Sequence, residues 1–341
     1  MKVSICIPTF NRAANLSNCL NSIIKCSSKS PHKFQVCVSD NNSTDETMKV
    51  VKNAQSYIDI KYIKNRNNLG IAGNFVKVVS IADGDFIWLI GDDDLLMPYA
   101  IGELFNLINS HPEVDFFYVN SFNLPNTYLS DFPSPFDTDN LPTEMETFSG
   151  WRAEGELPFL DLINPHISFD FLGGMFLSVF RRKNWVKYAN IIDKDAILDI
   201  RTFSHFDNTF PHVKIFARAF SKSNAYFNYR PLCVNLSGVR EWSSKSSLIN
   251  SVRLIEALKF YLHEGLPYWK YVYCKNFALR NFIPDFFKIF LYKETSGFYY
   301  IRPLKIIRNN CLYPNFYFSL FYFLFKKIVR LINTITNFIR L

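Results

Sequence analysis

The sequence lacks the cysteine pattern of a disulfide-stabilised or zinc-binding protein. Its 341 residues contain seven cysteines, which is an odd number, and no two of them have Cys-x-x-Cys spacing. Several lie within apolar runs, such as Cys6 in "VSICIP" and Cys37 in "FQVCVSD". Reduced, buried thiols in a cytosolic protein explain this pattern better than a disulfide framework or a zinc site does.

The sequence also has no evident signal peptide, internal repeat or membrane-spanning segment. The first ten residues, "MKVSICIPTF", read as the start of a strand and not as the long apolar region of a signal peptide. We find no repeat of fixed period. The most apolar aromatic run, 316–325, is followed by Lys326 and Lys327. A run of about ten residues is half of the roughly 20 that a membrane-spanning helix needs.

Charge, by contrast, is abundant and unevenly distributed. The net charge is +8, and residues 252–341 alone contain fourteen Lys or Arg against four acidic residues. The rest of the chain is close to neutral, so the basic character belongs to one C-terminal segment. The sequence is also rich in aromatic residues, with 35 Phe and 18 Tyr.

The N-terminal part alternates between predicted strands and predicted helices. Short apolar runs predict strands at 3–8, 34–40, 60–65 and 85–90. Helical spacing of apolar residues or helix-start signals predict helices at 13–27, 42–54 and 67–82. The second of these helices begins with a capping-box pattern from Ser43 to Glu46. This alternation predicts an α/β fold with a Rossmann-like, mostly parallel sheet flanked by helices.

Polar residues follow several of these strands directly. Thr9, Asn11 and Arg12 follow the first strand, Asp40 ends the second, and three consecutive aspartates, 92–94, follow the fourth. Ligands of such sheets bind at the carboxyl ends of the strands. Adjacent carboxylates repel one another and are tolerated where they face water, cap a helix or hold a cation. A solvated turn that caps the next helix is therefore the alternative to a cation site.

The later part of the chain divides into three segments. The region 124–165 is rich in Pro, Asp, Ser and Thr and predicts a long excursion that carries a variable binding surface. A strand followed by a turn is expected over 173–185, a helix at 207–220 and a further strand at 225–236. We therefore expect one domain over 1–250, with halves at about 1–120 and 121–250, and a basic, aromatic helical extension over 251–341.

Four sequence strings, in order along the chain, carry a family resemblance. They are "VSICIPTFNR", "VCVSDNNSTDET", "NLGIAGNF" and "LIGDDDLLMPYAI". Together they resemble the inverting glycosyltransferases of family 2, which have the GT-A fold. The resemblance covers 1–120 well and 170–240 loosely. The sequence around the aspartates is most similar to that of the bacterial O-antigen subgroup that includes abequosyltransferase.

The resemblance implies roles for individual residues. Those expected to bind the nucleotide sugar are Pro8, Thr9, Asn11, Arg12, Asp40, Asp92 and Asp93. A divalent metal, Mn²⁺ or Mg²⁺, is expected at Asp92 and Asp94. Because Gly91 stands where a common family form has another Asp, the resemblance leaves open which two of the three aspartates bind the metal.

The resemblance also implies a late acidic residue as the catalytic base. Its nearest match is Asp207 in "SHFDNTFPHV", for which a helix N-cap is an equal alternative. Lesser rivals are Asp170, Asp195 and Asp199. His205 and His212 are candidates to hold a diphosphate or the acceptor, with packed or surface histidines as the alternative. Arg240 and Trp242 are candidates for a loop that closes over the donor.

The function that follows is sugar transfer. We expect an inverting, metal-dependent glycosyltransferase of the hexosyltransferase class that moves a sugar from a nucleotide sugar to a polyprenyl-diphosphate-linked oligosaccharide in bacterial O-antigen assembly. The subgroup resemblance suggests a CDP-3,6-dideoxyhexose such as CDP-abequose as donor. Alternatives are an inactive GT-A scaffold and a nucleotidyltransferase, although "PTFNRAANL" lacks the glycine-rich loop that the latter needs.

The C-terminal segment suggests a location for this reaction. Aromatic and apolar residues of 315–341 alternate with a few basic ones, which favours a helix lying at the surface of an anionic membrane over a helix packed in the core. Nucleic-acid binding is less favoured, because few polar residues separate the apolar ones. We therefore expect a peripheral protein at the cytoplasmic face of the inner membrane.

Overall fold

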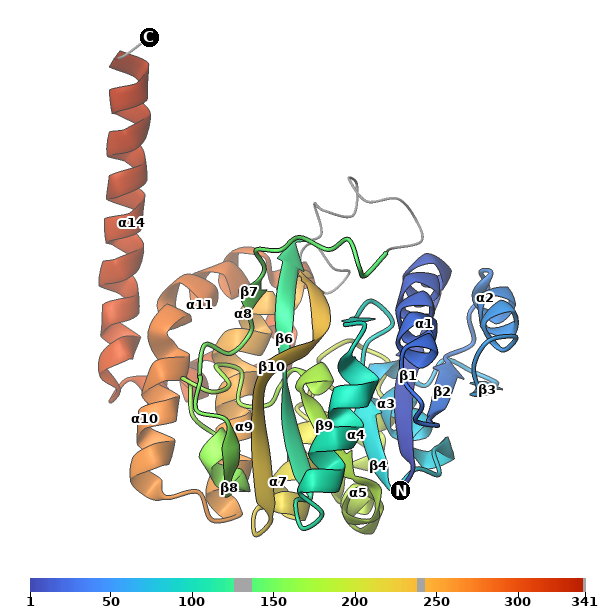
Figure 1. Cartoon of the computed structure of the whole chain (residues 1–341). Helices are drawn as coiled ribbons and strands as arrows, with labels where there is room; N and C mark the ends of the chain where they lie inside the picture. The colour runs from blue at the N-terminus through green and yellow to red at the C-terminus, as the bar shows by residue number, and fades with distance from the viewer. Residues whose placement is uncertain (126–136, 238–242, 340–341) are drawn as a thin grey trace.

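The computed structural model describes residues 1–125, 137–237 and 243–339, without the side chains of Lys326 and of 330–339. One sheet runs through the molecule in the order β3-β2-β1-β4-β9-β6-β10-β5, with β7 paired to β6 and β8 to β10 (Figure 1). The strands are β1 Val3–Thr9, β2 Gln35–Asp40, β3 Ile60–Lys64, β4 Phe86–Leu89, β5 Leu95–Leu96, β6 Phe116–Pro125, β7 Glu146–Thr147, β8 Gly155–Pro158, β9 Ser178–Arg181 and β10 Asn224–Ser237.

The N-terminal half of this sheet is parallel. Strand β1 pairs with β2 and β4, and β2 pairs with β3, all in parallel. The register sets Thr9 opposite Asp40, and Cys6 opposite Leu89 just before the aspartates. The carboxyl ends of these strands therefore meet at one edge. Beyond β4, strand β9 is antiparallel to both of its neighbours, so the second half of the sheet is mixed.

Helices flank the sheet and then continue into a helical C-terminal region, as the sequence predicts. Those of the first part are α1 Ala13–Ser28, α2 Thr47–Ala54, α3 Gly70–Ile81, α4 Ala100–Ser110, α5 Arg182–Tyr188, α6 Lys194–Leu198 and α7 Pro211–Phe220. Those of the C-terminal region are α8 Ser246–Leu248, α9 Leu254–His263, α10 Tyr268–Ala278, α11 Phe282–Leu291, α12 Lys293–Ser296, α13 Pro303–Asn310 and α14 Pro314–Ile339.

Helix α14 is the most prominent feature of the outline. Its first turns pack against α10 and α11, and the remainder extends beyond the other elements (Figure 1). Among the described residues, no helix combines the length and the apolar character that crossing a bilayer would require.

Much of the phenylalanine content lies in one aromatic core. Phe216 of α7 packs edge to face against Phe116 of β6 and Phe180 of β9, each with ring centroids 5.0 Å apart. Trp185 and Phe220 complete the cluster, and all five side chains are buried. Edge-to-face pairs of this kind stabilise a core beyond the area that they bury. This cluster joins α7 to the middle of the sheet, next to the loop that precedes α7.

The predicted capping box at Ser43 is wrong. Helix α2 begins at Thr47, and its N-cap residue, Glu46, makes no capping hydrogen bond with its side chain. The Ser43 hydroxyl instead accepts a hydrogen bond from the backbone N–H of Asn11 at 2.8 Å. The Ser43 hydroxyl, which the local pattern predicts to cap the helix, is thus used in a tertiary contact with Asn11 instead.

Parts of the predicted excursion at 124–165 form strands. Strand β6 continues to Pro125, and β7 and β8 add short antiparallel pairs to β6 and β10. Residues 126–136 of this excursion, and the predicted closing loop at Arg240 and Trp242, lie outside the described residues.

Candidate active site

A large cavity opens at the carboxyl edge of the parallel strands. Its volume is about 1180 Å³. Pro8 and Thr9 at the end of β1 and the aspartates 92–94 after β4 line it, as expected for ligands of an α/β sheet. Other walls come from the loops before β9 and α7 and from the C-terminal helices. The site is therefore built from segments that are distant in the sequence.

A charged cluster forms the strand-end wall of this cavity. Arg12 donates from Nη1 to Asp92 Oδ1 at 2.7 Å and from Nη2 to Asp93 Oδ2 at 2.8 Å. The Thr9 hydroxyl donates to Asp92 Oδ2 at 2.7 Å. We call these four residues the aspartate clamp. The guanidinium thus joins two adjacent carboxylates, which would otherwise repel each other.

Local backbone geometry positions Arg12 for this contact. Asn11 has a φ of 52°, in the left-handed region that Asn tolerates better than most residues. Its side-chain oxygen accepts a hydrogen bond from Thr44 N at 2.8 Å, which fixes the turn. Asn11 itself does not line the cavity. Its contribution in this structure is to direct the chain so that Arg12 reaches the carboxylates.

Burial affects the acidity of the clamp. Removal from water raises the pKa of Asp92 to about 7, against the opposing effects of Arg12 and the Thr9 hydroxyl. Asp93 and Asp94 raise it further, because an ionised neighbour disfavours a second negative charge. The site therefore favours a bound cation, which would offset the charge of these carboxylates.

The third aspartate has a different environment. Asp94 Oδ2 accepts from Gly91 N at 2.7 Å, and Oδ1 accepts from Asn235 Nδ2 at 2.9 Å. A Cβ at Gly91 would lie 2.7 Å from Asp93 Oδ1 and 3.0 Å from Asp94 Oδ2. A side chain at this position, where a common family form has aspartate, would therefore shift the Asp93 and Asp94 carboxylates from their present places.

The carboxylates fit a divalent metal ion. Asp92 and Asp93 already direct oxygen atoms at one cationic group, and carboxylate oxygens are the ligands that Mg²⁺ prefers. Within the described ranges, no group of three or more His, Cys, Asp or Glu side chains surrounds one point. Magnesium sites usually combine one or two carboxylates with oxygens of a bound phosphate, so the absence of an all-protein cage there is compatible with a metal.

Asp40 is buried just below the cavity. Its Oδ1 accepts from Ser43 N and its Oδ2 from the Tyr62 hydroxyl, both at 2.7 Å. The neighbouring Asn41 lines the cavity, whereas Asp40 does not. One oxygen of Asp40 thus holds the turn after Asn41, and the other is bound by Tyr62 of β3.

Sequence reasoning missed an asparagine network beside the clamp. Asn74 of α3 donates from Nδ2 to Ser39 O at 2.9 Å, and Asn41 donates to Asn68 Oδ1 at 2.7 Å. All three asparagines line the cavity. The string "NLGIAGNF" was the available signal, because Asn68 and Asn74 both lie in or next to it.

The structure does not bring Asp207 to the cavity. Its Oδ2 accepts from Lys214 Nζ at 2.7 Å and from Asp193 N at 2.6 Å, and it is not among the lining residues. Nor does it cap α7, whose N-cap residue is Phe210. The described geometry therefore gives no support to a role as base or as cap, and the assignment stays a prediction.

Of its three rivals, Asp170 is the one that lines the cavity. It accepts from Ser168 Oγ and Gly174 N, both at 2.6 Å, and burial raises the pKa of its carboxyl. His212 also lines the cavity. Its Nε2 lies 3.0 Å from Gly173 O, its Nδ1 has no partner among the described residues, and burial lowers its pKa to about 4.

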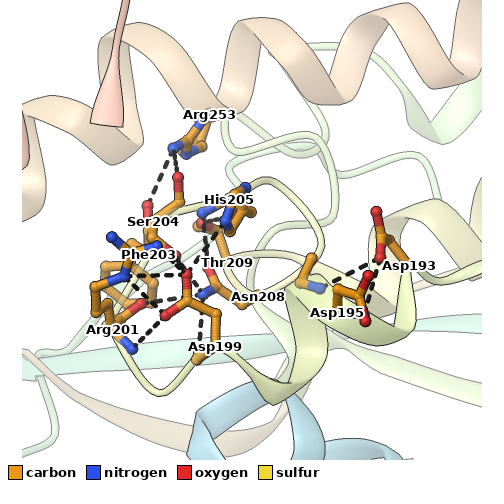
Figure 2. A network of polar contacts seen from close by, with 11 residues as sticks. Asp193, Asp195, Asp199, Arg201, Phe203, Ser204, His205, Asn208, Thr209 and Arg253 are labelled. Carbon is orange, nitrogen blue, oxygen red and sulfur yellow. Dashed lines mark hydrogen bonds and ion pairs between the residues drawn. The ribbon is translucent and has the colours of Figure 1, made fainter. Parts of the chain in front are cut away.

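A polar network fixes the loop that precedes α7 (Figure 2). Asp199 accepts from the Arg201 guanidinium and, at 2.7 Å, from the Ser204 hydroxyl, and the bond from Arg201 lowers the pKa of its carboxyl. The Arg253 guanidinium donates to the backbone oxygens of Phe203 and Ser204. Phe203 lines the cavity, so this network holds one of its walls.

Comparison with solved structures identifies the fold. Two crystal structures of Staphylococcus aureus TarS, one of them in complex with UDP-GlcNAc, superpose on 87% of this chain and on 74% and 75% of theirs. Their TM-scores are 0.54 and 0.55, at 15% and 16% sequence identity. The fold is of the GT-A type that the sequence predicts.

Comparison with sequences finds a family model that matches the N-terminal part of the chain. Residues 4–158 match Glycosyl transferase family 2. The matched stretch is similar to family 2 glycosyltransferases, and it contains the whole aspartate clamp.

Two named proteins are similar to this chain in sequence. Abequosyltransferase RfbV of Salmonella typhimurium is 27% identical over 246 residues, which cover 69% of this chain and 66% of that protein. A Campylobacter jejuni enzyme named GalNAc(5)-diNAcBac-PP-undecaprenol beta-1,3-glucosyltransferase is 37% identical over 110 residues, 32% of this chain and 35% of the relative. The chain thus spans just under two thirds of the first relative and about a third of the second.

Loss of Arg12 should destabilise the protein. Arg12→Ala removes two charge-assisted hydrogen bonds from the Asp92 and Asp93 carboxylates, and because Arg12 is partly exposed we assign this loss about 2 kcal/mol. We expect a loss of this size in the free energy of unfolding, measured with urea at pH 8 in chelator. Lys49→Ala is the control, because both side chains of its ion pair with Glu46 are exposed and such pairs contribute about 1 kcal/mol or less. Equal stability of wild type and Arg12→Ala would contradict the role of the clamp.

Proposed function

We propose that the protein is an inverting, metal-dependent glycosyltransferase that moves a sugar from a nucleotide sugar to a lipid-linked oligosaccharide in bacterial surface-polysaccharide assembly. The observation that carries this proposal is the aspartate clamp on a cavity wall within the stretch that matches family 2. The relatives named as an abequosyltransferase and an undecaprenol-linked glucosyltransferase support the sugar-transfer class and the lipid-linked acceptor.

The proposed donor site lies at the ends of β1, β2 and β4. The predicted nucleotide-sugar residues are proposed to act there in two ways. Pro8, Thr9, Arg12, Asp92 and Asp93 line the cavity and would contact the ligand, whereas Asn11 and Asp40 would support the turns beside it. Mn²⁺ or Mg²⁺, held by Asp92 with Asp93 or Asp94, would neutralise the charge that develops on the leaving diphosphate.

Inversion needs one displacement and one base. The acceptor hydroxyl attacks the anomeric carbon from the side opposite the diphosphate, and a carboxylate within hydrogen-bonding reach removes its proton. The sequence proposes Asp207 for this task. Asp170 is the alternative, because it lines the cavity, and the raised pKa of its carboxyl makes it a better proton acceptor once it is ionised.

We also propose candidates for the nucleotide and the sugar of the donor. The relative named abequosyltransferase favours a CDP-3,6-dideoxyhexose such as CDP-abequose. The TarS complex contains UDP-GlcNAc, which makes UDP the second nucleotide to consider. The family 2 match weighs against a nucleotidyltransferase, and an inactive scaffold remains as an outcome of the test below.

The proposed location is the cytoplasmic face of the inner membrane, because a lipid-linked acceptor would be presented at a membrane surface. Helix α14 has many exposed apolar side chains, and one stripe at helical spacing comprises Tyr317, Phe321, Leu324 and Ile328. The strongly basic segment 252–341 would attract anionic headgroups. We propose that this stripe rests on the membrane that presents the acceptor.

Nucleotide binding tests the donor site. Calorimetry with UDP, CDP, GDP and dTDP should detect one preferred nucleotide in the presence of Mn²⁺ and much weaker binding in chelator. Asp92→Ala/Asp94→Ala should weaken that binding by at least about tenfold, the effect of losing one charge-assisted contact. Asp83→Ala is the control, because its ion pair with Lys2 is exposed and away from the cavity. A folded protein that binds none of the four would favour the inactive scaffold.

Vesicle binding tests the proposed location. The wild type should sediment with anionic vesicles and much less with zwitterionic ones. Phe321→Ser/Leu324→Ser should lower the partition coefficient by about tenfold or more, since each buried apolar side chain contributes about 1.5–3 kcal/mol. The control is Tyr57→Ser, an exposed residue that follows α2. Salt-dependent binding to DNA without binding to vesicles would contradict the membrane proposal.

A further inference from the structure

The C-terminal helices form part of the cavity wall. Arg280 and Asn281, between α10 and α11, line the same cavity as Asp92 and Asp93. So do Phe318 and Tyr322 of α14. The volume of about 1180 Å³ exceeds the roughly 300–1,000 Å³ of a pocket for one small molecule. The cavity therefore has room for a second ligand beside the one at the clamp.

Arg280 supplies a positive charge on the part of the wall that the C-terminal helices form. Among the described lining residues, the Arg and Lys side chains are Arg12 and Arg280 alone. Arg12 is bound to the clamp carboxylates, whereas Arg280 has no hydrogen bond or ion pair to the described part of the chain. Its guanidinium lies 4.0 Å from the centre of the Phe277 ring, which fixes its position without using its N–H donors.

A nearby carboxylate does not neutralise Arg280. Asp285 lines the same wall, but its Oδ1 and Oδ2 accept hydrogen bonds from Ser247 and Ser251 at 3.0 and 2.7 Å. Arg280 is exposed, and its partial loss of hydration lowers the pKa of its guanidinium, which Asp285 partly opposes. A guanidinium with its donors free binds diphosphate well, because its planar fork matches phosphate oxygens.

An apolar stripe leads away from this cation. Phe318 and Tyr322 both line the cavity and are exposed, and Phe325 and Val329 follow them at helical spacing on the same side of α14. This stripe is distinct from the one that begins at Tyr317. Together, Arg280 and the second stripe present a cation at the cavity wall and an apolar surface that continues from it.

We propose that Arg280 binds the diphosphate of a lipid-linked acceptor, with the lipid chain lying along the stripe from Phe318 to Val329. The acceptor sugar then extends into the cavity toward the clamp. This inference rests on the proposed function for the class of acceptor. The two diphosphates of the reaction thus bind at different walls, the donor's at Asp92 and Asp93 and the acceptor's at Arg280.

The test measures binding of a fluorescent polyprenyl diphosphate to the full chain. Arg280→Ala should weaken this binding by about tenfold to hundredfold, and Arg280→Lys should restore part of it, because the charge remains while the fork is lost. Lys305→Ala is the matched control, since Lys305 is an exposed cation of the same C-terminal region that does not line the cavity. Circular dichroism confirms that each variant is folded.

Three further ligands separate the outcomes. Binding of the preferred nucleotide diphosphate should be unchanged in Arg280→Ala, and inorganic diphosphate and polyprenol should each bind more weakly than the polyprenyl diphosphate. Equal loss of nucleotide binding would assign Arg280 to the donor and overturn the proposal. Nucleotide binding without any binding of the polyprenyl diphosphate would overturn it while leaving the proposed donor site intact. Arg280-dependent binding of the lipid without nucleotide binding would support the subsite and contradict the proposed function.

Discussion

The ion pairs of Arg12 with Asp92 and Asp93 are the contacts on which the site depends. Three consecutive carboxylates in a buried turn repel one another, and burial with the two neighbouring carboxylates raises the pKa of Asp92 to about 7 even beside Arg12. The guanidinium, the Thr9 hydroxyl and the bonds that hold Asp94 to Gly91 N and Asn235 compensate for this. The cluster can be charged only because strand ends far apart in the sequence deliver these partners. Because one guanidinium offsets only part of the charge of three carboxylates, the site is suited to a second cation, which can in turn bind an anionic ligand.

The rest of the architecture extends this site across the molecule. The parallel half of the sheet supplies the clamp, and the network around Asp199 and Arg253 holds the loop before α7 against the cavity (Figure 2). The C-terminal helices then add Arg280 and the aromatic side chains of α14 to the same cavity. The helical extension is thus a wall of the site as well as a proposed membrane contact. This arrangement would give the proposed donor and the proposed acceptor separate walls of one cavity.

Sequence reasoning succeeded where the signal is local. The alternation of strands and helices is confirmed, because the buried apolar runs and helical spacing reflect the sheet and the helices that cover it. The aspartates and Arg12 could be anticipated, since each directly follows a strand. Reasoning failed where a distant partner decides. The Ser43 hydroxyl accepts a hydrogen bond from Asn11 N instead of capping α2. Arg280 carries no local signal, because only the packing of α10, α11 and α14 brings it to the cavity.

The proposed role of the clamp is to hold the donor's diphosphate through a metal ion. The most direct measurement is the anomalous diffraction of Mn²⁺ in crystals grown with the preferred nucleotide diphosphate. We expect one anomalous peak in contact with Asp92, a phosphate oxygen on the same ion, and the Arg12 guanidinium moved from at least one of its two carboxylates. A nucleotide bound elsewhere, or bound with Arg12 still on both carboxylates and no ion beside Asp92, would contradict this account.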